Sequence, residues 1–357
     1  MPSWPLATPW LAAVLGLLSA LVLLRSAPRL GAHRGRAVGV LLLALAMGSY
    51  ANAYFAYLPK LGDVAGPRPW PVASAQAASR PVGAAVASTQ EVTYRSRGAV
   101  VTLALRGAVS RTPTRGALVY LPPQYFSQPA RRFPVLYLLH GSPGVPLDWF
   151  RGGEAAAAGL TAARAGSPAI LVAPRMSTGW LADSECVDGP ALQAESYLVD
   201  DVVPDIDRLL RTTRAAVARG VAGNSAGGYC ALAVGLRHPT VFSHVAALSP
   251  LTMPTYTYGT LADLFGHPAD LPAVVERHTP GWLLQHRPDS RSVQLRIDVG
   301  DADPLRKDAR VLAVLDKRVG GHPQLVVRPG GHTFRVWRPA LRDAVGWFAR
   351  GAGSQGS

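Results

Sequence analysis

The stretch Gly223-Asn224-Ser225-Ala226-Gly227-Gly228 is the most informative part of this sequence. It contains G-x-S-x-G, a pattern in which the serine occupies a tight turn between a strand and a helix. Bulky residues two positions before or after the serine would clash in such a turn. A strand-like stretch precedes the turn, and the helical sequence YCALAVGL follows it. The turn would lift the Ser225 hydroxyl to the N-terminus of that helix, where negative charge is stabilised. We therefore predict that Ser225 is a nucleophile; an ordinary glycine-rich turn is the structural alternative.

Strand and helix patterns alternate on both sides of this turn. Short apolar runs bounded by turn residues predict strands at 100–105, 117–121, 135–139, 169–173, 220–223, 245–248, 295–299 and 324–328. Alanine-rich or helically spaced apolar residues predict helices at 154–165, 197–210 and 229–236. Such alternation predicts an α/β fold with a mostly parallel central sheet and helices on both faces.

A serine hydroxyl needs a general base, and in this type of fold the chain order is Ser, then Asp or Glu, then His. His332 lies in RPGGHTFRVW, directly after the predicted strand QLVVR and near the C-terminus. The two preceding glycines allow its loop to fold over the edge of the sheet. His238 precedes a proline and is expected to end a helix, and His322 is expected in a loop. His332 is therefore the predicted base.

The acid that orients the base should follow an earlier strand, and LRIDVGDADPL offers three aspartates. Asp298 lies within the predicted strand, whereas Asp301 and Asp303 lie in the loop beyond it. Asp303 is favoured and Asp301 is the alternative, although either could be a turn-forming Asp. The chosen carboxylate would hold the tautomer of the imidazole and stabilise the imidazolium.

Two backbone amides are expected to form an oxyanion hole. One is the N–H of Ala226, the residue after the nucleophile; the other should lie in the loop after an earlier strand. The sequence LLHGSPG supplies that loop, with Ser142 following Gly141 as the predicted donor. Pro143 has no backbone N–H and is therefore excluded as an oxyanion donor. For His140 we expect a role in shaping the turn rather than in catalysis.

Two long apolar stretches, at about 4–24 and 37–58, precede the α/β pattern. Each has about 20 residues, enough to cross a hydrocarbon core of ~30 Å as a helix. Positive loops tend to stay in the cytoplasm, and the segment between the stretches carries Arg25, Arg29, Arg34 and Arg36 without an acid. We predict two membrane spans, with all that follows on the extracytoplasmic side of the cell membrane.

A signal peptide is the alternative, and Ala51-Asn52-Ala53 resembles a cleavage site. The Pro-, Ala- and Gly-rich segment 59–90 reads as a flexible linker. The catalytic domain is predicted over 91–350, followed by a disordered tail over 351–357.

Composition narrows the functional classes. Lys and Arg outnumber Asp and Glu by 36 to 22, giving a net charge of +14, but the cations are scattered and match no nucleic-acid-binding motif. We therefore expect no nucleic-acid partner. The spacing of the two cysteines, Cys186 and Cys230, is not that of a metal site. They could be buried thiols or, in an oxidising compartment, one disulfide. We predict neither a metal nor a cofactor.

Four stretches together resemble one family: VLYLLHGSPG, GNSAGGYCALAVGLRHPTVFSHVAALSP, DVGDADPL and PGGHTFRVWRPAL. In this order, over about residues 95–350, they are similar to the putative esterase family of α/β-hydrolases, which includes esterase D-like enzymes and mycobacterial mycolyltransferases. The resemblance implies an α/β-hydrolase fold. It also implies a catalytic triad of Ser225, Asp303 and His332, with Ser142 and Ala226 as the oxyanion donors.

Asp303 is preferred within this resemblance because the family places its acid three residues after the glycine, here Gly300. DSECVDGP followed by ESYLVDDVVPDID looks like actinobacterial extracytoplasmic members, in which Cys186 and Cys230 would pair. The chain departs from many members at Asn224-Ser225-Ala226, where a larger residue often follows the serine. This departure affects the expected substrate preference.

Three functions follow as hypotheses. The first is a membrane-anchored serine esterase acting on acyl-ester or lipid substrates. The second is a mycolyltransferase-like acyltransferase, in which a sugar hydroxyl replaces water; the difference lies in how water and acceptor reach the site. The third is a non-catalytic binding protein with the same fold, which an intact Ser-Asp-His set disfavours. Residues of about 250–290 are expected to form a lid over the acyl pocket.

Overall fold

The computed structural model describes residues 9–26, 33–58, 89–179, 182–256 and 259–353, and its chain divides into two units. The smaller unit contains helices α1 (Pro9–Ser26) and α2 (His33–Phe55). The two helices pack closely: the Ser19 hydroxyl donates to the Gly39 carbonyl at 2.8 Å. A Cβ at Gly39 would come within 2.5 Å of the Leu23 side chain, so this glycine permits the approach.

Most of the outward-facing side chains on these helices are apolar. Leu17, Leu24 and Met47 are 67%, 72% and 66% exposed. In the described chain one helical stretch, His33–Ala53, is long and apolar enough to cross a membrane, and α1 contributes the shorter apolar stretch Trp10–Arg25. The predicted first span, 4–24, begins outside the described residues, and α2 ends before the predicted limit of the second span, 37–58. Nearly all of the predicted linker, 59–90, also lies outside the described residues.

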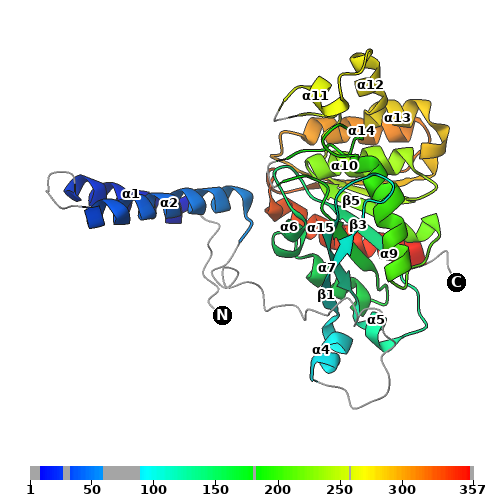
Figure 1. Ribbon diagram of the computed structural model, residues 1–357, viewed down its shortest axis with the longest axis horizontal. Coiled ribbons are helices and arrows are strands. Elements are labelled where there is room, and N and C mark those ends of the chain that lie inside the picture. The colour runs from blue at the N-terminus through cyan, green and yellow to red at the C-terminus, as the bar shows by residue number, and fades with distance from the viewer. Residues whose placement is uncertain (1–8, 27–32, 59–88, 180–181, 257–258, 354–357) are drawn as a thin grey trace. The chain divides into compact units, whose positions relative to one another are not determined.

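The larger unit is built on one sheet of eight strands in the order β1-β2-β4-β3-β5-β6-β7-β8 (Figure 1). The strands are β1 (Ala99–Leu105), β2 (Arg115–Leu121), β3 (Val135–Leu139), β4 (Ile170–Pro174), β5 (Arg219–Asn224), β6 (His244–Leu248), β7 (Gln294–Gly300) and β8 (Gln324–Arg328). The β1–β2 and β2–β4 pairs are antiparallel and all others are parallel. Each predicted strand is present within two residues of its expected bounds, and the α/β class is confirmed.

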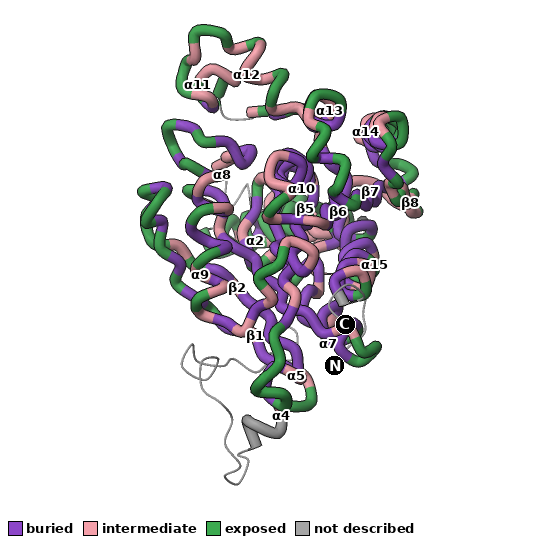
Figure 2. The backbone as a smooth tube through the Cα atoms, turned by 90° about the vertical axis from the view of Figure 1, so that its right-hand side faces the viewer, coloured by how far each residue is buried: buried purple, intermediate pink, exposed green. Residues whose placement is uncertain are grey.

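Helices cover both faces of this sheet. Successive residues of a strand point to opposite faces. A Cβ at Gly220 would meet Phe348 of α15 (Phe334–Gly353), whereas Val221 lies toward Gly235 of α10 (Ala226–Arg237). Helices α15 and α10 therefore pack on opposite sides of β5. Figure 2 shows the buried residues concentrated in these central elements.

The remaining helices connect and surround the strands. They are α4 (Thr89–Arg97), α5 (Pro123–Ser127), α6 (Pro146–Arg151), α7 (Ala155–Arg164), α8 (Ala194–Ser196), α9 (Val203–Leu209), α11 (Leu261–Phe265), α12 (Leu271–Arg277), α13 (Pro280–His286) and α14 (Arg306–Arg318). The helix predicted over 197–210 begins as a π-helical turn, Tyr197–Val202, before α9. Helix α15 extends through Gly353, so the first three residues of the predicted disordered tail, 351–357, are helical. The other four lie outside the described residues.

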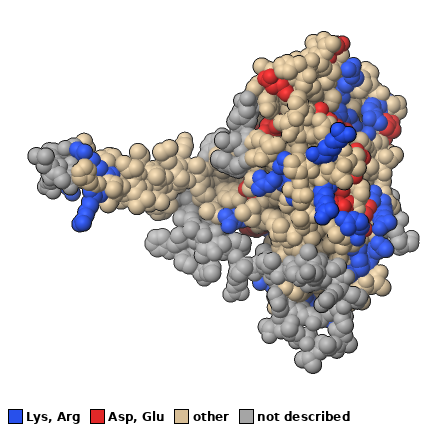
Figure 3. All heavy atoms as spheres, viewed as in Figure 1, with Lys and Arg blue, Asp and Glu red and all other residues tan. Residues whose placement is uncertain are grey.

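Charge is spread differently over the two units. On the face shown in Figure 3, Lys and Arg are dispersed over the larger unit, with Asp and Glu among them. On α1 and α2 the visible cations gather at one end, and residues other than Lys, Arg, Asp and Glu cover the rest of the described helices in this view.

Candidate active site

The turn after β5 holds Ser225 in a strained conformation. Its φ and ψ are 55° and −123°, a region that favours glycine. The Ser225 amide donates to the Leu248 carbonyl at 2.9 Å, which fixes the turn to the end of β6. A Cβ at Gly223 would lie 1.9 Å from the Gly227 oxygen, and one at Gly227 would lie 2.2 Å from the Leu139 oxygen. Backbone contact on both sides explains why this turn needs glycine two residues before and after the serine.

Ser225, His332 and Asp303 meet at the carboxyl edge of the sheet, from the segments that follow β5, β8 and β7. The Ser225 Oγ lies 2.9 Å from the His332 Nε2. The other ring nitrogen, Nδ1, lies 3.0 Å from Asp303 Oδ2 and 3.2 Å from Oδ1. Because Nδ1 donates to a carboxylate, Nε2 is left as an acceptor for the serine proton. The arrangement can activate a hydroxyl for nucleophilic attack.

Asp303 remains ionised although its side chain is fully buried. Burial by itself would raise its pKa, but hydrogen bonds from His332, the Ser249 hydroxyl and the Leu305 amide outweigh burial and hold the pKa below the usual value. The Leu305 amide donates to Asp303 Oδ1 at 2.9 Å. A buried carboxylate with these donors is suited to orient an imidazole.

The other two aspartates of this segment have different partners. Asp301 accepts the Gly330 amide at 2.9 Å and so shapes the loop that carries His332. Asp298 is buried between the guanidinium groups of Arg296 and Arg328. In the structure the His332 ring thus contacts Asp303, whereas Asp301 and Asp298 bond to the backbone and to arginines.

The predicted oxyanion donors lie beside Ser225. Ala226 is the first residue of α10, and the amides of a first helical turn have no acceptor within the helix. The loop with Gly141 and Ser142 passes so close that a Cβ at Gly141 would lie 3.5 Å from the Ser225 Cβ. The peptide bond between Ser142 and Pro143 is cis. Both predicted donors therefore belong to segments that pass next to Ser225.

His140 braces this loop. The Met176 amide donates to its Nε2 at 3.2 Å, which leaves the proton on Nδ1, where it bonds to the Gly141 carbonyl at 2.9 Å. Burial lowers the pKa of His140, so the ring stays neutral. With both nitrogens occupied, His140 has the structural role expected from the sequence.

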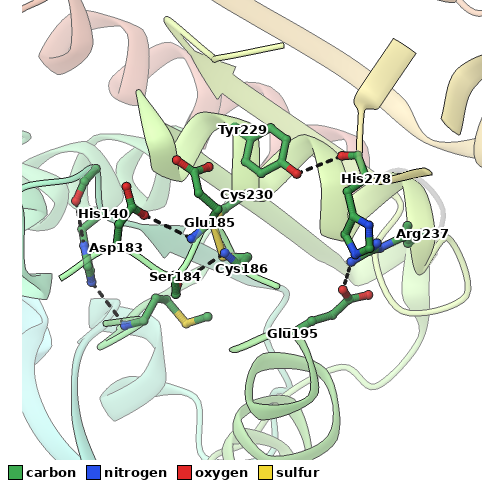
Figure 4. The surroundings of a disulfide bond; sticks show 12 residues. His140, Asp183, Ser184, Glu185, Cys186, Glu195, Tyr229, Cys230, Arg237 and His278 are labelled. Carbon is green, nitrogen blue, oxygen red and sulfur yellow. Dashed lines mark hydrogen bonds and ion pairs between the residues drawn. A yellow bond between two sulfur atoms is a disulfide. The ribbon is translucent and has the colours of Figure 1, made fainter. Parts of the chain in front are cut away.

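A disulfide joins Cys186 to Cys230 (Figure 4), and Cys230 borders one cavity with Ser142 and Ala226. We call the loop that the disulfide fixes the wall of the site. Cys230 lies in α10, shortly after Ser225, and Cys186 lies in the loop after β4. Residues Glu185 and Cys186 have positive φ values of 41° and 49°. The cross-link thus holds a strained loop against the helix of the nucleophile.

This loop lines a small cavity next to the oxyanion donors. The cavity is bounded by Ser142, Ala226, Asp183, Ser184 and Cys230, together with His140, Gly141, Met176, Ser177 and Ala182. Asp183 and Ser184 also line a neighbouring pocket with Tyr256 and Leu264, which come from the predicted lid. Polar side chains from one loop therefore border both hollows.

Two carboxyl groups stand in this wall, the buried Glu185 and the half-buried Asp183. Burial raises the pKa of Asp183, and hydrogen bonds from nearby amides and hydroxyls offset part of that rise. Burial, reinforced by the charge of Asp183, raises the pKa of Glu185 well above its usual value. The Thr255 hydroxyl donates to Glu185 Oε1 at 3.2 Å. Glu185 thus ties the wall to the lid segment.

Sequence reasoning overlooked these carboxyl groups and also Ser249 and Trp337. The acids lie in DSECVDGP, which drew notice only for its cysteine. Trp337 lies five residues after His332, and Ser249 follows β6 directly. The available signal was position: residues that follow a strand at the edge of the sheet that carries the nucleophile are candidates for the site. Among the described residues, no group of three or more His, Cys, Asp or Glu could hold a metal ion.

Comparison with known proteins identifies relatives. Residues 112–348 match the profile of a family described as putative esterase. An uncharacterized protein of Corynebacterium glutamicum is 30% identical over 275 residues, which cover 73% of this chain and 64% of that protein. The chain therefore spans less than two thirds of that relative.

Two solved structures share the fold. A ferulic acid esterase is 26% identical in sequence, with a TM-score of 0.63. The match covers 71% of this chain and 97% of the chain of that esterase. The fluorophosphonate-binding serine hydrolase F of Staphylococcus aureus is 17% identical with a TM-score of 0.60, covering 70% and 98%.

Proposed function

The chain belongs to the putative esterase family, and on that premise we propose that it hydrolyses carboxylic esters through an acyl-enzyme on Ser225. The observation that carries the proposal is the 2.9 Å contact between Ser225 Oγ and His332 Nε2, on a ring whose other nitrogen donates to buried Asp303. The ferulic acid esterase supports the same chemistry, since it is 26% identical over 71% of this chain.

The reaction follows from this geometry. His332 Nε2 takes the proton of Ser225 as Oγ attacks the ester carbonyl. The carbonyl oxygen becomes an oxyanion that accepts hydrogen bonds from the amides of Ser142 and Ala226. The imidazolium, stabilised by Asp303, then gives its proton to the leaving alkoxide, which departs as the alcohol. Water, deprotonated by the same nitrogen, attacks the acyl-enzyme; the imidazolium then returns this proton to the departing Ser225 oxygen, and the acid is released.

Ser225→Ala tests this proposal. We expect fluorophosphonate labelling and hydrolysis of p-nitrophenyl esters to be lost, with kcat at least about 10⁴-fold lower. Ser96→Ala, at an exposed serine of α4, serves as the matched control and should label as the wild type does. Full labelling of Ser225→Ala would contradict the proposal.

Product analysis separates hydrolysis from acyl transfer. We expect the free acid to be the main product even with a sugar added in excess. An acylated sugar as the main product would show that water is excluded from the acyl-enzyme and that the protein is an acyltransferase. A panel of p-nitrophenyl esters of increasing chain length defines the acyl preference.

We further propose that α1 and α2 anchor the enzyme in the cell membrane, with the catalytic unit on the extracytoplasmic side. The exposed leucines of α1, the apolar stretch of α2 and the disulfide support this location, because disulfides persist in oxidising compartments. Protease added to intact spheroplasts should digest the catalytic unit and abolish its activity. Protection of that unit until the membrane is permeabilised would contradict the proposed topology.

A further inference from the structure

His332 has a buried neighbour, Trp337, which the proposed reaction does not use. The rings of His332 and Trp337 meet edge to face, with centroids 4.8 Å apart. The indole N–H of Trp337 donates to the Ser249 hydroxyl oxygen at 2.9 Å. Trp337 and Ser249 are 4% and 0% exposed, so no bulk water competes for this bond.

The direction of hydrogen bonding through Ser249 is fixed by chemistry. An indole nitrogen can only donate, so the Ser249 oxygen is the acceptor in its bond with Trp337. The single proton of Ser249 is then available to another acceptor, and this hydroxyl is one of the groups that lower the pKa of the neighbouring Asp303 carboxylate. We therefore assign the Ser249 proton to Asp303, so that the polar contacts lead from Trp337 through Ser249 to the carboxylate.

The backbone holds Ser249 at this junction. The Ser249 φ is 49°, an uncommon value for a residue with a Cβ. Its amide donates to the Asp298 carbonyl at 2.7 Å, which ties it to β7. Strained residues cluster at functional sites because the surrounding structure must over-determine them. Ser225, at the end of the adjacent strand, is the other strained serine of this site.

We propose that Ser249 and Trp337 are positioning residues that hold the Asp303 carboxylate in line with the Nδ1 of His332. The inference rests on the proposed function. Ser249 acts on the carboxylate directly, whereas Trp337 acts through Ser249 and also packs against the edge of the imidazole. Both side chains are buried and are assigned no contact with the substrate.

Two substitutions each remove one polar contact: the one between Ser249 and Asp303, or the one between Trp337 and Ser249. Ser249→Ala deletes the hydroxyl but keeps the Cβ and thus the same backbone strain. Trp337→Phe deletes the indole N–H but keeps an aromatic ring beside His332. A hydrogen bond to a charged group corresponds to about tenfold in rate or more, so we expect kcat to fall about tenfold in Ser249→Ala and less in Trp337→Phe, with KM unchanged.

The double variant gives the decisive readout. Because Trp337 acts on the carboxylate through Ser249, Trp337→Phe in the Ser249→Ala background should lower kcat little further. Trp347→Phe, on the same helix and next to His244 rather than His332, is the matched control and should keep wild-type kcat. The downfield proton signal of His332 Nδ1–H should move in Ser249→Ala but stay unchanged in the control.

The outcomes are distinguishable. Wild-type kcat in Ser249→Ala, or losses that multiply in the double variant, would overturn the positioning role while the effect of Ser225→Ala still supports the esterase. Full activity in Ser225→Ala would remove both. If Ser249→Ala fails to fold, Ser249→Gly deletes the same hydroxyl and relieves the positive φ, and the same fall in kcat is expected.

Discussion

The active site has two sides that are built differently: the edge of the sheet that carries Ser225, Asp303 and His332, and the loop wall around Asp183 and Glu185. On the edge, each side chain follows a strand and is placed by backbone contacts that leave no room for a Cβ. On the wall, an irregular loop with positive φ values is cross-linked by a disulfide, and its hydrogen bonds include one from the lid segment. The reactive groups thus depend on the sheet, whereas the loop beside the predicted oxyanion donors depends on a cross-link.

The edge should be the more sensitive side, and Asp303→Asn tests it most strongly. An amide at this position would donate to Nδ1 and move the imidazole proton to Nε2, which then cannot accept the serine proton. We expect kcat/KM to fall by about 10⁴-fold. Asp301→Asn is the control, because an amide oxygen still accepts the Gly330 amide, and it should lose less than about tenfold. A larger loss in Asp301→Asn would assign the orienting role to Asp301.

The wall should lose stability when its cross-link is removed. Cys186 and Cys230 are separated by 44 residues, a loop whose closure stabilises the fold by about 4 kcal/mol in the chain-entropy model. The double variant Cys186→Ser/Cys230→Ser should melt at a lower temperature than the wild type and show no response to dithiothreitol.

Fluorophosphonate labelling of that double variant sharpens the comparison. We expect Ser225 to remain reactive below the melting temperature while KM for esters rises, because the edge stays formed and the wall moves. Loss of labelling in a variant that is still folded would show that the edge also depends on the disulfide.

The smallest effect concerns Glu185 and varies with pH. Its folded pKa lies above the unfolded one, so its contribution to stability is full below about pH 4.3 and is lost as pH rises through the folded pKa. Glu185→Gln cannot ionise and escapes this loss. We expect its Tm to match the wild type near pH 4 and to exceed it by about 2–4 °C at pH 8, the change that about 1 kcal/mol produces. Glu276→Gln, at an exposed acid of α12, should show no such pH-dependent gain.

The sequence alone predicted the α/β class, all eight strands and the three residues now found in hydrogen-bond contact. These features have local causes. Strand runs are short and apolar, the turn around Ser225 needs its glycines, and chain order restricts the acid and the base to a few positions. The N-terminal apolar stretches were also visible as composition, although the described residues contain one stretch that meets the length and hydropathy of a span.

The sequence favoured Asp303 over Asp301 only through the spacing seen in the family, whereas the tertiary structure shows the physical difference: Asp303 contacts His332, and Asp301 accepts the Gly330 amide. The tertiary structure also brought Ser249 and Trp337 to Asp303 from segments 54 and 34 residues away along the chain. The same holds for the pair Asp183 and Glu185, whose pKa values rise through burial. The hydrogen bonds and the burial of these side chains come from segments that lie far apart along the chain. One amino-acid sequence therefore contains no direct signal for them.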